Sequence, residues 1–138
     1  MWTRYKYERS NQVAQSLNVK VDFTGEAIAY LGFAEYGKIL IGDYAFEFFN
    51  DRSAENNMQF PWKSIERVEG SIFKSFGGKQ SVGKSFSVVF HNGKRVRFSS
   101  KDSGTILKFI RQYIGNEKVV KARRFGDIFR RFRKKKKV

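Results

Sequence analysis

The dipeptide Asn92-Gly93 is the feature that most constrains the fold of this chain. It separates two short runs that are rich in β-branched and aromatic residues, Phe86–Phe90 and Val96–Phe98. Asn and Gly both tolerate the positive φ angles that the centre of a two-residue type I′ turn requires, and such turns join adjacent antiparallel strands. We therefore expect a β-hairpin over residues 86–98, with Asn92 and Gly93 at its centre.

Most of the preceding sequence, from residue 23 onward, also has the pattern of β-strands. Gly42-Asp43 is expected to form a tight turn between strands at 38–41 and 44–49. The second of these runs is apolar on both faces except at Glu47, which predicts a central strand. Pro61 cannot donate to a ladder and indicates an edge or a strand end. Apolar residues between positions 65 and 73 predict a further strand pair, broken near Gly70.

The period of the apolar residues changes after Phe98 to that of a helix. Asp102 is a favourable N-cap and Gly115 is placed to end the helix. The apolar positions between them recur every three or four residues, and Lys108 and Arg111 face away. Strands followed by one amphipathic helix predict an α+β domain, an antiparallel β-barrel or sandwich closed by that helix. We expect a flexible extension at 1–12, the domain at 13–115, and a basic helical tail at 116–138.

Composition excludes several classes of function. The chain has no cysteine and one histidine, which excludes disulfides, thiolate metal sites and thiol catalysis. No nucleophile–base pair is visible, and we expect a protein that is not an enzyme and uses no metal or cofactor. No apolar run approaches the roughly 20 residues of a membrane-spanning helix, and no signal peptide is visible. The sequence therefore predicts a cytoplasmic protein.

Three patterns resemble functional motifs and are interpreted structurally. Residues 78–85 match the phosphate-loop pattern G-x-x-x-x-G-K-[ST], but Lys84-Ser85 opens a predicted strand instead of the helix that such a loop needs. That strand also resembles the aromatic strand of RNA-recognition motifs, and we interpret it as a core strand. His91 is interpreted as a solvated turn residue. The acidic residues Asp43, Glu47 and Asp51 are assigned to turns and a solvent-exposed face.

Four segments carry a resemblance to a known family. They are Gln15–Asp22, Tyr36–Arg52, Phe60–Trp62 and Phe98–Asp102. Their order resembles an uncharacterised bacterial family of small proteins encoded beside mannose-class phosphotransferase transporters and sometimes described as regulators of that operon. The resemblance covers about residues 13–131 and implies a pleckstrin-homology-like or GRAM-like fold, with Trp62 as a core anchor. It also implies an association with the sugar transporter.

The C-terminal tail is the strongest functional signal in the sequence. Residues 121–138 hold ten basic residues and one acid, a net charge of +9 out of +15 for the whole chain. On a helix, four apolar residues would share one face and the cations would fill the rest, a pattern typical of peripheral membrane helices. The predicted membrane- or partner-binding residues are Arg123, Arg124, Phe125, Ile128, Phe129, Arg130, Arg131, Phe132, Arg133, Lys134, Lys135, Lys136 and Lys137.

Three other roles for this tail remain open. Its apolar face would also suit docking back onto the domain or packing into a transporter's cytoplasmic groove, and its cations would suit non-specific nucleic-acid binding. The expectation we develop is a non-enzymatic accessory module, peripheral at the inner membrane face, with an anionic membrane surface and mannose-class transporter subunits as partners. No small-molecule ligand is expected. The alternative is a nucleic-acid-binding transcriptional regulator of the mannose phosphotransferase operon.

Overall fold

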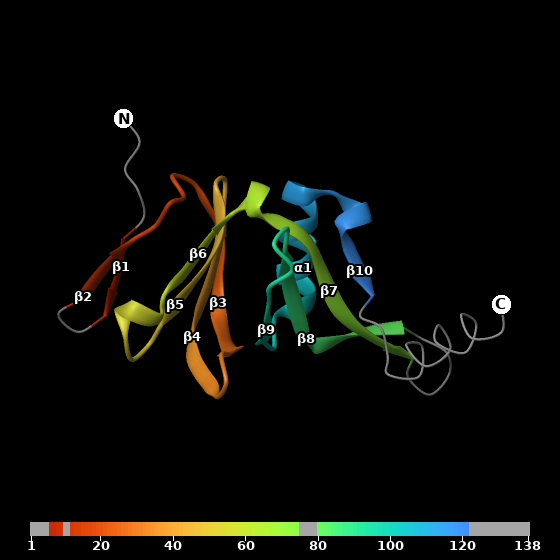
Figure 1. Cartoon of the computed structure of the whole chain (residues 1–138), viewed down its shortest axis with the longest axis horizontal. Helices are drawn as coiled ribbons and strands as arrows, with labels where there is room; N and C mark the ends of the chain where they lie inside the picture. Colours follow the sequence, from red (N-terminus) through yellow and green to blue (C-terminus); the bar gives the residue numbers. More distant parts are fainter. Residues whose placement is uncertain (1–5, 10–11, 75–79, 122–138) are drawn as a thin grey trace.

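The computed structural model describes residues 6–9, 12–74 and 80–121 (Figure 1). The strands are β1 (Lys6–Arg9), β2 (Gln12–Gln15), β3 (Val21–Tyr30), β4 (Ala34–Gly42), β5 (Ala45–Asn50), β6 (Met58–Pro61), β7 (Ile65–Lys74), β8 (Gln80–Phe90), β9 (Arg95–Ser99) and β10 (Val119–Lys121). The helices are α1 (Ser103–Ile114) and the short 3-10 segments η1 (Ala54–Asn56), η2 (Trp62–Ser64) and η3 (Asn116–Lys118).

Eight of the strands form one open sheet in the order β10-β7-β8-β9-β3-β4-β5-β6, and β1 pairs with β2 in a separate hairpin. The α+β class is therefore correct. Of the predicted barrel or sandwich, the closed barrel is wrong, because the edges β6 and β10 are not joined. The sheet is also not purely antiparallel, because β10 pairs with β7 in parallel. Pro61 ends β6 and has no N–H to offer a further strand, as its sequence position predicted.

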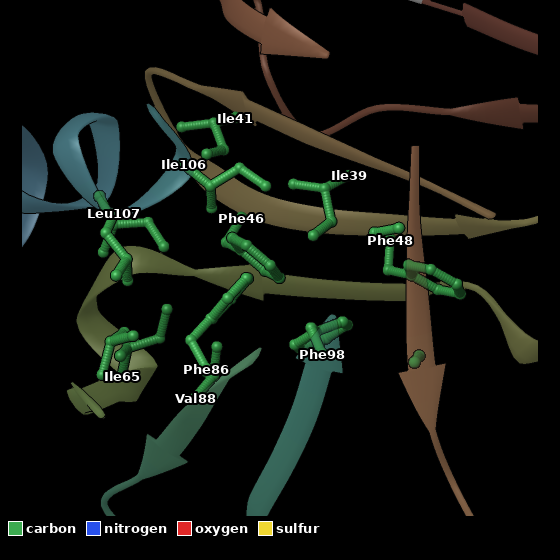
Figure 2. Packing of buried hydrophobic residues seen from close by; sticks show 14 residues of the cluster. Ile39, Ile41, Phe46, Phe48, Ile65, Phe86, Val88, Phe98, Ile106 and Leu107 are labelled. Carbon is green, nitrogen blue, oxygen red and sulfur yellow. The ribbon is translucent and has the colours of Figure 1, made fainter. Parts of the chain in front are cut away.

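The sheet folds over a core of aromatic and aliphatic side chains (Figure 2). Phe46 and Phe48 on β5 face Phe98 on β9, with ring centroids 5.2 Å and 5.8 Å away. Phe86 on β8 also packs on Phe98, at 5.6 Å. Buried phenylalanine rings carry a large apolar area, so this cluster dominates the burial that stabilises the domain.

Helix α1 covers this core with the face that the sequence predicts. Ile106, Leu107 and Ile110 are buried, whereas Lys108 and Arg111 are exposed. Asp102 occupies the N-cap position without a side-chain hydrogen bond to the helix. At the other end Gly115 takes a φ of +97°, which favours glycine and explains why the helix stops there.

Strand β5 lies between β4 and β6, and all six of its residues are buried, as a central strand requires. The assignment of Glu47 to a solvent-exposed face is wrong, because its side chain is fully buried. Its carboxylate accepts hydrogen bonds from Ser16 Oγ, from the Leu17 N–H at 2.9 Å and from Asn18 Nδ2 at 2.8 Å. Gln59 Nε2 donates a further bond at 2.5 Å. The segment before β3 is thus fastened across β5 by one carboxylate.

The predictions for the two other acidic residues, Asp43 in a turn and Asp51 on an exposed face, are confirmed. Asp43 Oδ1 accepts hydrogen bonds from the N–H groups of Val19 and Lys20, at 2.9 Å and 3.0 Å, which is turn chemistry. Asp51 is exposed after the end of β5. These acids therefore do not converge on one site.

The β8–β9 hairpin exists, but its turn differs from the prediction. Val89 pairs with Arg95, and the Phe90 N–H donates to Lys94 O at 2.9 Å, so three residues, His91 to Gly93, form the loop. The Gly93 N–H donates to Phe90 O at 2.9 Å, and Gly93 follows with a φ of +87°. This is the geometry of a three-residue loop with glycine in the left-handed position. The positive φ predicted for Gly93 is confirmed, but Asn92 is not the first of two central residues with a positive φ, as a type I′ turn would require.

Strand β7 is continuous where the sequence predicted two strands. It runs from Ile65 to Lys74 and pairs with β8, with a register irregularity between Gly70 and Ile72. A bulge of this kind adds local twist without ending the strand. The glycine therefore marks a bend in one strand and not a break between two.

Candidate functional site

The predicted tail site lies outside the described residues. Arg123, Phe129 and the eleven other predicted binding residues all fall between 122 and 138. The described chain ends in β10, whose exposed Val120 and Lys121 are at an edge of the sheet. The tail therefore begins at the surface of the domain.

The structure has a strand and no helix at Lys84 and Ser85, as interpreted from the sequence, but this strand begins earlier than expected, at Gln80. Lys84 and Ser85 lie within β8, so the phosphate-loop pattern has no helix at the position where phosphate binding would need one. Phe86, Val88 and Val89 on the same strand are buried and are not available to stack on bases. The described part of the pattern, residues 80–85, belongs to strand β8.

A groove of about 760 Å³ lies between β6 and the β8–β9 turn. Met58, Phe60, Phe90 and Val96 give it apolar walls, and the rings of Phe60 and Phe90 are 4.6 Å apart. The groove opens where the sheet is not closed, because the edge strand β6 has no partner on that side among the described strands.

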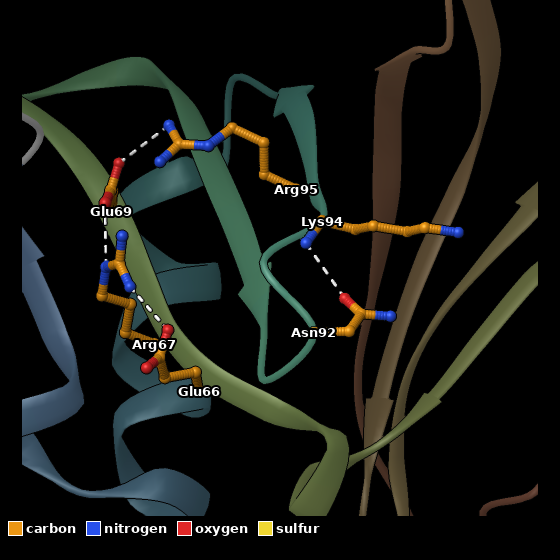
Figure 3. A network of polar contacts seen from close by, with 6 residues as sticks. All are labelled: Glu66, Arg67, Glu69, Asn92, Lys94 and Arg95. Atoms are coloured by element: carbon orange, nitrogen blue, oxygen red, sulfur yellow. Dashed lines mark hydrogen bonds and ion pairs between the residues drawn. The ribbon is translucent and has the colours of Figure 1, made fainter.

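Two cations, Lys94 and Arg95, are among the residues that line this groove, and Figure 3 shows their side chains. Arg95 is held by Glu69 at 3.1 Å, and Glu69 also pairs with Arg67 at 2.9 Å. Lys94 extends away from this network, and no ion pair to it occurs in the described part of the chain. His91 is exposed in the turn, as predicted. The groove offers apolar contact, an ammonium group, a guanidinium group and an imidazole, and no carboxylate occurs among the described residues that line it.

A polar contact ties the end of α1 to β3. Tyr113 donates a hydrogen bond to Asp22 and stacks on Trp62, with ring centroids 4.8 Å apart. Burial, together with the Asp22 carboxylate, raises the pKa of Tyr113 from 10.0 to about 12. The Trp62 indole N–H donates to Gly42 O at 2.9 Å. Trp62 thus packs against the core at the start of β7, as the family resemblance implied.

The β3–β4 turn carries exposed apolar side chains that the sequence argument did not single out. Leu31, Phe33 and Tyr36 are 39%, 75% and 62% exposed. Phe33 and Tyr36 line a hollow of about 300 Å³ together with Arg52. The signal was present in the sequence, because residues 31–34 read Leu-Gly-Phe-Ala and contain no polar side chain in a turn.

Comparison with known proteins places the chain in a family. A model described as Domain of unknown function (DUF956) matches residues 13–132. The chain belongs to this family. No curated protein matches it. The match begins where the resemblance drawn from the sequence begins, near Val13, and includes most of the tail.

One solved structure shows that the fold occurs elsewhere. The crystal structure of the C-terminal domain of an unknown protein from Leishmania infantum matches with a TM-score of 0.55 and 11% sequence identity. The match covers 69% of this chain and 84% of that one. At this identity the likeness concerns the fold alone.

Two further tests concern the described part of the chain. None of its helices is long and apolar enough to cross a membrane. It also contains no group of three His, Asp or Glu residues placed to hold a metal ion. The features with clear binding chemistry are the apolar groove and the exposed β3–β4 turn.

Proposed function

We propose that this protein is a non-enzymatic accessory module that works at the inner face of the cell membrane, beside a mannose-class sugar phosphotransferase transporter. The observation that carries the membrane part is the composition of residues 121–138, where four large apolar residues alternate with ten cations. Anionic bilayers attract each such cation by about 1 kcal/mol, and aromatic rings insert at the acyl boundary. The transporter part rests on the family resemblance described above.

The folded body supports this proposal in two ways. The buried hydrophobic cluster of the described residues is built from residues 27–110 and needs no contribution from beyond Lys121 to join its two halves. Edge strand β10 delivers the chain to the surface at Lys121. We also infer a pleckstrin-homology-like or GRAM-like relationship from the order of strands followed by a helix, although the sheet here is open.

Sedimentation with vesicles tests the proposal. At near-physiological salt, the full chain should sediment with vesicles of phosphatidylglycerol and phosphatidylcholine and much less with phosphatidylcholine alone. Phe129→Asp should weaken this binding strongly, because a carboxylate replaces a ring that enters the lipid, whereas Phe129→Leu should retain most of it. A full chain that remains in the supernatant with anionic vesicles would contradict the proposal.

Duplex DNA provides the arm that tests the alternative regulator. Non-specific binding through phosphates falls steeply with salt, and Phe129→Asp should change it little beyond the effect of one added negative charge. Equal losses of vesicle and DNA binding would indicate contact with phosphate alone. Salt-resistant binding to the promoter of the transporter operon would instead favour the regulator.

A further inference from the structure

The β3–β4 turn gathers exposed apolar side chains to a degree that no other turn in the described residues matches. Five large hydrophobic residues are exposed in the described part of the chain. Three of them, Leu31, Phe33 and Tyr36, lie in this turn or at the start of β4, and the others are Tyr44 and Val120. No charged side chain occurs between Tyr30 and Glu35. We refer to Leu31, Gly32, Phe33 and Ala34 as the apolar turn.

Folding of the hairpin does not explain this composition. Gly32 supplies the positive φ of +96°, and the Leu31 N–H donates to Phe33 O at 3.2 Å. Leu31 and Phe33 are absent from the hydrophobic core cluster and from the residues packed against it. The β8–β9 turn, by contrast, is built from His91, Asn92 and Gly93, the polar chemistry that turns favour. The apolar side chains are therefore available to something outside the domain.

Cations lie beside the aromatic rings of this hairpin. Arg52 shares a hollow with Phe33 and Tyr36, and the guanidinium of Arg97 lies 4.2 Å from the centre of the Tyr30 ring. Lys84 and Lys101 line the hollow on the other side of Tyr36. Glu26, Glu35 and Asp51 line the same hollows, so the local charge is only slightly positive. Because this local charge is small, any binding partner of the turn would be held mainly by contact with its apolar side chains.

We infer that the apolar turn inserts into the headgroup–acyl boundary of an anionic bilayer, as a second contact besides the tail; this inference rests on the proposed function. Three side chains on a projecting hairpin are too few for a stable protein interface, which buries about 1,200–2,000 Å². They suit a bilayer, where apolar groups need to enter only about 5–10 Å.

The arrangement of the domain agrees with this placement (Figure 1). The β3–β4 turn lies on the lower side of the molecule in that view, and β10 runs toward the same side before the chain leaves the described region at Lys121. The β4–β5 turn is at the other end of the nine-residue strand β4. At about 3.4 Å per residue, Tyr44 would stand about 30 Å from the apolar turn, in water.

A fluorescent label reports the depth of a single position. Because the chain has no cysteine, Phe33→Cys in the full chain carries one environment-sensitive nitrobenzoxadiazole group, and Tyr44→Cys serves as the control. Tyr44 is 61% exposed, which is comparable to Phe33, and it lies beyond the opposite end of β4. With phosphatidylglycerol–phosphatidylcholine vesicles we expect a blue shift and a gain in intensity at position 33 and neither at position 44.

The failures of the two proposals are distinguishable. A labelled protein that sediments with vesicles while its position-33 label stays in water overturns the insertion and leaves the proposed function intact. A protein that does not sediment overturns both. A dimer in solution that Phe33→Ser converts to a monomer would assign the turn to a second copy of the chain and also overturn the insertion.

A second measurement does not depend on the label. The double variant Leu31→Ser, Phe33→Ser in the full chain should bind anionic vesicles about tenfold more weakly, since each large side chain loses its apolar burial. This loss should be similar at low and high salt, because it is not electrostatic. Tyr44→Ser should bind as the wild type does. A double variant with unchanged affinity and an unchanged melting curve would overturn the insertion.

Discussion

The two ends of strand β4 are built on opposite principles. At the β4–β5 end, Asn18 Oδ1 accepts hydrogen bonds from the N–H groups of Tyr44 and Ala45, at 2.8 Å each. Trp62 donates to Gly42 O at this end as well. At the β3–β4 end, Phe33 is 75% exposed and Gly32 has no heavy atom within 4 Å of where a Cβ would stand. One end is tied to two other segments, the one before β3 and η2, whereas the other end exposes its apolar side chains.

This difference separates folding from function within a single strand. A residue whose polar atoms are all paired inside the domain contributes to stability, and its replacement leaves buried partners unsatisfied. A single exposed apolar residue needs no explanation, but several large ones gathered on one exposed surface indicate a contact with something outside the domain. Mutations at the tied end should therefore change stability, whereas mutations at the open end should change binding only.

The largest expected effect is that of Glu47→Ala, next to the tied end. The change leaves four donors without their common acceptor: Ser16 Oγ, Leu17 N–H, Asn18 Nδ2 and Gln59 Nε2. Ser16 and Asn18 are fully buried. We expect a loss of about 3–5 kcal/mol in the free energy of unfolding, measured by urea denaturation. Glu55→Ala, at an exposed glutamate in η1, is the matched control and should change it by less than about 0.5 kcal/mol. A small loss for Glu47→Ala would show that the carboxylate does not fasten the segment before β3.

A smaller effect, with a distinctive pH dependence, is expected for Tyr113→Phe. The folded state raises the pKa of Tyr113 from 10.0 to about 12, so the unfolded chain ionises first as the pH rises. The stabilising contribution is complete below pH 10 and is lost between about pH 10 and pH 12. At pH 7 the variant should lose about 1–2 kcal/mol, because the bond to Asp22 is gone.

The measurement is the free energy of unfolding of both proteins from pH 9 to pH 12. The wild type should lose stability more steeply than Tyr113→Phe over this range, so that the two curves converge. Other tyrosines and lysines titrate in both proteins, so their contributions cancel in the difference between the two curves. Parallel curves would therefore contradict the raised pKa of Tyr113 in the folded state.

Sequence patterns predicted the elements that local chemistry determines. The helix was placed correctly because its apolar spacing, the cap position Asp102 and the terminal Gly115 all lie within one short segment. The central position of β5 followed from apolar residues on both faces of the strand. Pro61 marked an edge because a missing donor has the same consequence in any sheet.

The features that were missed depend on partners distant in sequence. The burial of Glu47 requires donors about 30 residues earlier, and no local pattern indicates that Ser16, Leu17 and Asn18 will cross β5. Strand β10 is only three residues long and is specified by parallel pairing with β7. The three-residue β8–β9 loop was missed because Asn-Gly suits two turn types, and only the strand register decides between them.

The candidate sites divide in the same way. The tail could be recognised from composition alone, and its binding role stays a prediction. The apolar groove could not be recognised, because Met58 and Phe60 belong to one edge of the sheet whereas Phe90 and Val96 belong to a hairpin 30 residues later. The β3–β4 turn was readable as an apolar segment, but only its exposure distinguishes it from a buried one.

The smallest expected effect on stability is that of Leu31→Ser, Phe33→Ser at the open end of β4. Neither side chain packs against the core, and the glycine that the turn needs is unchanged, so the free energy of unfolding should stay within about 0.5 kcal/mol of the wild type. Urea denaturation of the isolated protein, without vesicles, measures this. A loss of 2 kcal/mol or more, on the order of a core truncation, would show that the turn serves folding and would remove the difference between the two ends. An unchanged stability would mean that any loss of vesicle binding in the same variant comes from the missing apolar contact, since the population of folded protein is the same.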